Sequence, residues 1–168
     1  MFGEILTGSY ERWHGLDPRL TLEKLAKLIG PVVVHAPEQR NRIATRYLVS
    51  RMERRAPPFN LEAWIPFGSR QVAIVEVEDP VCVDLQSTLD AMGVPETILE
   101  DQRLSTDYLV YEFVFPARGI NLSIGKPLDS SVQAGRRLLH VRLFSPMSLQ
   151  SYVTEVGEPK PAHPHTNL

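Results

Sequence analysis

The hydrophobic positions between residues 108 and 124 repeat every second residue, which is the period of a β-strand. Pro116 and Gly119 begin and end a four-residue turn between the two apolar runs, as β-turn chemistry favours. Pairing Phe115 with Ile120 places all the apolar side chains on one face, and a shift of one residue would break this match. The pattern therefore predicts a β-hairpin in this register. Its apolar positions are Leu109, Tyr111, Phe113, Phe115, Ile120, Leu122 and Ile124.

Two further stretches have strand character. Gln71 to Val77 is apolar on both faces, which is typical of a strand covered on both sides. Arg137 to Phe144 alternates again and continues the apolar face of the hairpin. Together with the hairpin, these stretches predict about four antiparallel strands.

Helical spacing appears on both sides of the predicted strands. Thr21 to Ile29 repeats its apolar residues at i, i+3, i+4 and i+7, between a possible threonine N-cap and a Gly-Pro stop. Asp84 to Met92 forms a similar pattern that ends at Gly93. Met147 to Val153 is predicted to be a short closing helix.

A longer helix is predicted from Glu38 to Arg54, because its apolar residues cluster on one broad side when plotted at helical period. Pro57 and Pro58 would end it. The polar stretch Glu96 to Asp107 is expected to be a loop, and residues 157–168 a disordered tail.

These elements predict an α+β fold, an antiparallel sheet of about four strands with helices packed on one face. We expect a single domain over residues 1–156, with a helical N-terminal region (residues 1–56) and a sheet-containing region (residues 57–156). The length of 168 residues is ample for one hydrophobic core. No apolar run is long enough to span a membrane, and the start of the chain lacks the pattern of a secretory signal, so a cytoplasmic location is expected.

The charge is unevenly distributed although the net charge is only −2. The stretch from Gln71 to Glu112 contains ten acidic residues and one arginine. Residues 40–55 contain six arginines and one glutamate, which is an excess of five positive charges. This basic segment suggests contact with nucleic acid or an acidic partner, or with the acidic half of the chain itself. Its arginines are Arg40, Arg42, Arg46, Arg51, Arg54 and Arg55.

Catalytic signatures are sparse. The sequence has no phosphate-binding glycine loop, paired-cysteine metal site or nucleophile elbow, so no cofactor and no metal are expected. The single Cys82 is interpreted as a structural thiol. A small hydrolase built on His35 or His140 is an alternative, with Glu112 and Ser123 as possible partners of His140.

The side of the hairpin opposite its apolar face, together with the same side of the last strand, has a mixed composition. Aromatic and arginine side chains among aliphatic ones are typical of a protein-contact surface. We therefore expect this face to be exposed for partner binding, or else covered by the arginine-rich segment. Its residues are Tyr108, Val110, Glu112, Asn121, Ser123, His140, Arg142 and Phe144.

Residues 84 to about 153 resemble the helix-plus-antiparallel-meander unit of the β-lactamase-inhibitor-like and outer-membrane-assembly lipoprotein families. The resemblance rests on Leu89, the helix stop Met92-Gly93-Val94-Pro95-Glu96, the strand Tyr108 to Phe115 and the turn that follows it. It implies a non-enzymatic module that binds other proteins through its sheet.

The leading hypothesis is thus a non-catalytic protein-binding module, such as an inhibitor, an immunity factor or an assembly component. The alternatives are nucleic-acid binding through the basic segment and the histidine-based enzyme.

Overall fold

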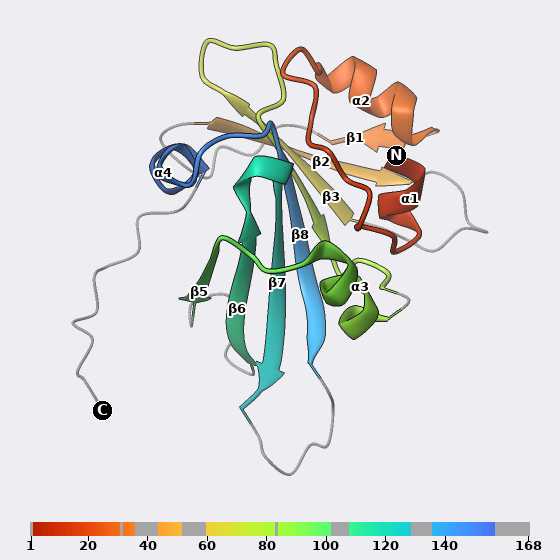
Figure 1. Ribbon diagram of the computed structural model, residues 1–168. Coiled ribbons are helices and arrows are strands. Elements are labelled where there is room, and N and C mark those ends of the chain that lie inside the picture. Colours follow the sequence, from red (N-terminus) through yellow and green to blue (C-terminus); the bar gives the residue numbers. More distant parts are fainter. Residues whose placement is uncertain are drawn as a thin grey trace.

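The computed structural model of the chain describes residues 2–30, 32–35, 44–51, 60–82, 84–101, 108–128 and 136–156. Within these residues, eight antiparallel strands form one sheet in the order β1-β2-β3-β4-β8-β7-β6-β5 (Figure 1). The first and last strands of this order, β1 and β5, are its edges. The strands are β1 (Val32–Val34), β2 (Ala44–Arg51), β3 (Asn60–Pro66), β4 (Ile74–Glu78), β5 (Thr97–Asp101), β6 (Tyr108–Phe115), β7 (Ile120–Pro127) and β8 (Arg137–Phe144).

The helical elements are short and surround this sheet. Two helices precede β1, one lies between β4 and β5, a 3₁₀ turn joins β6 to β7, and the described chain ends in an α-helical turn followed by a π-helical one. They are α1 (Phe2–Leu6), α2 (Leu22–Ile29), α3 (Leu85–Met92), η1 (Pro116–Arg118), α4 (Leu149–Ser151) and η2 (Tyr152–Val156).

The α+β class and the antiparallel sheet are confirmed, but the described part of the sheet has eight strands instead of about four. The four predicted strands are neighbours within it, in the order β4-β8-β7-β6. The hairpin register is the predicted one, because Phe115 pairs with Ile120 and Phe113 with Leu122. These strands were predictable because burial imposes a regular apolar pattern on them.

The helix predicted from Glu38 to Arg54 is wrong where the structure describes it. Positions 44–51 form β2, which pairs with β1 on one side and β3 on the other. The apolar residues of this segment fit the spacing of a helix and also that of a strand. Pairing with two neighbouring strands favours the strand. The division into a helical region (residues 1–56) and a sheet region (residues 57–156) fails for the same reason, since β1 and β2 belong to the common sheet.

The predicted loop from Glu96 to Asp107 is also wrong over Thr97–Asp101, which is the edge strand β5. Its two apolar residues, Ile98 and Leu99, are flanked by acids, and an edge strand needs only one neighbour. The tail predicted for residues 157–168 lies outside the described residues.

The predicted helices 21–29 and 84–92 are confirmed, together with their ends. The Thr21 hydroxyl accepts a hydrogen bond from the backbone N–H of Lys24, and Gly30 follows with a positive φ of 105°. The Asp84 carboxylate accepts bonds from the N–H groups of Gln86 and Ser87, and Gly93 ends α3. Such caps satisfy backbone groups that have no partner within a short helix.

The main hydrophobic core lies between the sheet and helices α1, α2 and α3, which are on the same side of it (Figure 1). Ile5, Leu25 and Met92 are buried there against Val141 and Leu122 from the centre of the sheet. The opposite face is packed too, because Tyr152 of η2 forms a separate small cluster with Val114 and Phe144. The prediction that helices pack on one face therefore holds for α1 to α3 but not for the C-terminal segment.

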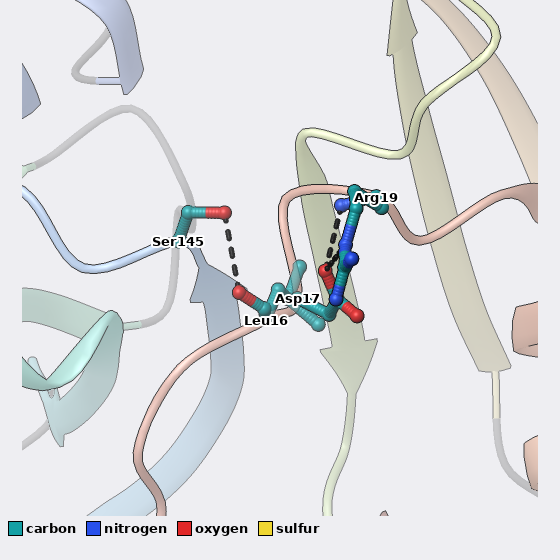
Figure 2. A network of polar contacts seen from close by, with 4 residues as sticks. All are labelled: Leu16, Asp17, Arg19 and Ser145. Atoms are coloured by element: carbon teal, nitrogen blue, oxygen red, sulfur yellow. Dashed lines mark hydrogen bonds and ion pairs between the residues drawn. The ribbon is translucent and has the colours of Figure 1, made fainter.

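Residues 10–17, between α1 and α2, are attached to the β6–β7 turn and to the end of β8. The Trp13 indole N–H donates to the carbonyl of Gly119 at 3.0 Å. The Arg118 guanidinium donates to the carbonyls of Tyr10, Glu11 and Trp13. Further along, the Leu16 N–H donates to the Phe144 carbonyl at 3.0 Å, and the Ser145 hydroxyl donates to the Leu16 carbonyl at 3.3 Å (Figure 2). This segment therefore ties the start of the chain to the last strand.

Gly119 is where this attachment leaves least space. Its φ is +64°, and a Cβ there would overlap the carbonyl oxygen of Phe144. We expect Gly119→Ala to lower the free energy of unfolding by about 3 kcal/mol, combining left-handed strain with a displaced backbone. Gly68 is the matched control, because its φ is +77° and nothing lies within 4 Å; its alanine variant should lose only about 1 kcal/mol. Urea denaturation of both variants measures the difference, and equal losses would contradict it.

Candidate functional site

The eight residues predicted to form a partner-binding face do share one face of the sheet. Cross-strand pairs join Glu112 to Ser123, Ser123 to His140 and Asn121 to Arg142. Because side chains alternate along a strand, Tyr108, Val110 and Phe144 lie on this same face. The parity of the sequence was therefore sufficient to group them.

The expectation that this face is exposed is wrong for most of it. Val110, Glu112, Asn121, Ser123 and Phe144 are buried, Tyr108 and His140 are half-buried, and the Arg142 side chain is only 11% exposed. In β6 the face that was expected to be buried is the less buried of the two, because Leu109, Tyr111 and Phe113 are only half-buried. The C-terminal segment folds back over part of the predicted partner-binding face, and the sequence pattern of the strands contains no information about that.

A buried ion pair stands at the centre of this face. The Nε and Nη2 atoms of Arg142 both lie 2.8 Å from Oε2 of Glu76, and each side chain is only 11% exposed. The guanidinium also lies 5.9 Å from the centre of the Trp64 ring, which adds a cation–π contact. Burial opposes the charge of Arg142, but Glu76, Tyr152 and Glu112 outweigh it, so its pKa is raised above the ordinary value. Arg142 is therefore held charged in the interior.

Tyr152 covers one end of this ion pair. Its hydroxyl accepts a hydrogen bond from Nδ2 of Asn121 at 2.6 Å, and its ring packs on Phe144 with centroids 5.0 Å apart. Burial raises the pKa of Tyr152 to about 12, and the nearby charge of Glu112 acts in the same direction. We name Glu76, Glu112, Asn121, Ser123, His140, Arg142 and Tyr152 the polar cluster.

The polar cluster does not assemble the arrangement that acid–base or nucleophilic catalysis needs. His140 Nδ1 lies 3.8 Å from Oε1 of Glu76, beyond hydrogen-bond distance. Ser123 is the cross-strand neighbour of both His140 and Glu112, yet it is buried, with 4% of its surface exposed. A substrate has no access to such a hydroxyl, so the polar cluster is interpreted as internal structure.

The other predicted sites are not brought together. Arg46 and Arg51 belong to strand β2, so they do not form the basic helix face that was expected of them. Arg40, Arg42, Arg54 and Arg55 lie outside the described residues. His35 is exposed after β1, and within the described residues no three His, Cys, Asp or Glu side chains form a group that would hold a metal ion.

A surface that the sequence reasoning missed lies at the β5 edge. Val94, just before β5, is 93% exposed, and Ile98 within it is 53% exposed. Ile98 pairs with the half-buried Phe113, and Glu100 pairs with the half-buried Tyr111. The only sequence signal for this surface was the apolar pair Ile98 and Leu99 in β5, and the acidic residues around this pair made the segment look like a polar loop. We name Val94, Glu96, Ile98, Glu100, Tyr111 and Phe113 the β5–β6 surface.

The outer edge of β5 is the second feature of this surface. β5 is the terminal strand of the sheet and pairs only with β6 among the described strands. A strand edge presents unpaired backbone N–H and C=O groups that another strand can bind. The β5–β6 surface therefore combines backbone hydrogen-bonding groups with exposed apolar side chains and acidic ones.

Comparison with known proteins adds no relative. No family model matches the chain, and no curated protein or solved structure is significantly similar to it. The resemblance to β-lactamase-inhibitor-like and lipoprotein modules thus stays a prediction. None of the described helices is long and apolar enough to cross a membrane.

The buried ion pair generates a stability prediction. Replacing Arg142 by Met leaves the Glu76 carboxylate buried without its guanidinium, so we expect a loss of about 3 to 5 kcal/mol. Adding Glu76→Gln to that variant should recover some of the loss, because the buried charge is then removed. The exposed pair between Arg137 and Asp79 is the control, and Arg137→Met should cost less than about 1 kcal/mol. Urea unfolding of the four proteins checks this; equal losses for Arg142→Met and Arg137→Met would contradict it.

Tyr152 generates a prediction of pH dependence. Its pKa in the folded protein is about 12, above the ordinary 10.0, so the folded state keeps the phenol proton after the unfolded state has lost it. Stability from this group is complete below pH 10 and falls between pH 10 and 12, by up to about 1.4 kcal/mol per pH unit. The difference in unfolding free energy between wild type and Tyr152→Phe should be constant from pH 7 to 9 and shrink above pH 10. Parallel stability curves up to pH 11.5 would refute this.

Proposed function

We propose that this protein is a non-catalytic protein-binding module that adds an extended segment of its partner to the free edge of β5. The observation that carries the proposal is the exposure of Val94 and Ile98 beside a terminal strand of the sheet. Backbone pairing along such an edge supplies affinity, and side chains at alternate positions supply specificity.

The aromatic neighbours of β5 support the same proposal. Phe113 and Tyr111 are half-buried on β6, directly opposite Ile98 and Glu100. Together they form an apolar and aromatic strip two strands wide on the side of the sheet that faces α3. Aromatic residues are enriched in protein interfaces because they provide large, rigid contact area.

The charge of the surface indicates what kind of partner it would bind. Glu96 and Glu100 are exposed on either side of Ile98, and they belong to the segment with ten acids and one arginine. An extended partner segment that alternates apolar residues with Lys or Arg would match this surface. Of the two edge strands, β1 has only three residues, all valine, and lacks this charge.

The proposal is tested by site-specific photo-cross-linking in the organism of origin, followed by binding measurements on the purified pair. A photoreactive residue at position 98 should capture a protein that the same residue at position 28 does not. Leu28 is the matched control because it is an apolar residue with similar exposure, 59% against 53% for Ile98, on the remote helix α2. Ile98→Asp should then weaken the purified complex at least tenfold, while Leu28→Asp leaves the affinity unchanged.

Two results would overturn the proposal. One is that position 98 captures nothing beyond what position 28 captures. The other is that both aspartate variants bind the captured protein equally well. Circular dichroism and urea unfolding of both variants verify that each is folded, which is expected because both side chains are largely exposed.

A further inference from the structure

A cavity of about 580 Å³ lies on the side of the sheet that carries the main core, next to the start of α3. Figure 1 shows α3 beside β8, whose first residues form the other wall. The cavity is therefore separated by the sheet from the polar cluster, and it contains neither His35 nor His140. Its lining residues are Pro80, Cys82, Asp84, Leu85, Gln86, Leu89, Arg136, Arg137 and Leu138.

Part of the lining of this cavity is apolar, although polar groups make up the larger share of its exposed surface. Leu85 and Leu89 project from successive turns of α3, and Leu138 belongs to the main hydrophobic core. Concave sites of several hundred Å³ that combine apolar and polar groups can hold small molecules. The size and the leucine side chains thus suit a compact molecule with a polar headgroup and a short apolar body.

The polar groups of the rim are not equally available. The Asp84 carboxylate caps α3 by accepting from the N–H groups of Gln86 and Ser87 at 3.3 and 3.1 Å. The Arg137 guanidinium is paired with Asp79 at 2.7 Å. Arg136 is exposed at the rim and forms no hydrogen bond or ion pair with any residue that the structure describes. Arg136 is therefore the charged group of the lining without a partner among the described residues, whereas the Asp84 carboxylate keeps its negative charge and is held by the N–H groups of α3.

We propose that this cavity binds a small amphipathic anion, with its apolar body on Leu85, Leu89 and Leu138 and its acidic headgroup on Arg136. A guanidinium binds carboxylate and phosphate groups through charge-assisted hydrogen bonds. The apolar chain gains affinity by leaving water for the leucine-lined wall. This site is independent of the β5–β6 surface and of the partner proposed there.

Cys82 provides a direct reporter for occupancy. It is the single cysteine of the chain, it lines the cavity and it is half-buried. Burial raises the pKa of the Cys82 thiol, so its reaction with a disulfide reagent is slow and can be followed at mildly alkaline pH. A ligand in the cavity should shield the thiol and slow the reaction further.

The experiment measures the labelling rate of Cys82 against increasing octanoate, octyl phosphate or octanol, all below micelle-forming concentrations. We expect saturable protection by at least one anion and much weaker protection by octanol; the stronger anion identifies carboxylate or phosphate as the preferred headgroup. In Arg136→Gln, the anion concentration for half-protection should rise about tenfold or more, as for loss of one charged hydrogen bond. Arg70→Gln, at an exposed arginine in the loop before β4, should behave like wild type.

The reaction of a small free thiol under the same conditions corrects for direct effects of the additives on the reagent. The inference is overturned if neither anion slows labelling of Cys82, if octanol protects as well as the anions, or if Arg136→Gln and Arg70→Gln respond alike. Since Arg136 is exposed and forms no hydrogen bond or ion pair with the described residues, its variant should remain folded, which urea unfolding verifies.

Discussion

The attachment of residues 10–17 to the β6–β7 turn is the contact on which the rest of the molecule depends. The Trp13 indole N–H donates to a backbone carbonyl of the turn, and the Arg118 guanidinium of the turn donates to backbone carbonyls of residues 10–17. Arg118 also donates to the carbonyl of Met92 at the end of α3. One turn thereby holds the N-terminal segment and α3 on the same side of the sheet. Without it, the main core would lack the cover that α1, α2 and α3 provide.

The two faces of the sheet are stabilised by different interactions. The face toward the helices is apolar and gains stability by removing hydrocarbon from water. The other face buries carboxylates and a guanidinium, and such groups are tolerated only when they are paired and hydrogen-bonded. Glu76 and Arg142 satisfy that condition across β4 and β8, and Tyr152 with Asn121 extends it toward β7. The mixed composition that resembles a contact surface is here an interior one.

The features that remain available to other molecules lie away from the polar cluster. At one end of the described sheet, β5 lies in an acidic segment, with the apolar residues Val94 and Ile98 exposed. Beside α3, a cavity combines a leucine wall with an arginine that has no partner among the described residues. The two proposed ligands, a protein segment and a small amphipathic anion, need surfaces of different shape, one extended and one concave, and their proposed sites lie at separate places in the fold.

Local patterns in the sequence determined the central strands, the hairpin register and the capped helices, because burial and capping act on residues close in the chain. They also grouped Tyr108, Glu112 and Arg142 on one face. Only the tertiary structure decided that this face is covered, that positions 44–51 form a strand and that β5 is the last of the described strands in the sheet. Each of these outcomes depends on a segment distant in the sequence, such as Tyr152 folding back over Phe144 or β3 pairing with β2. A periodic pattern shows which residues lie together, but the partner that covers them comes from the packing of the whole chain.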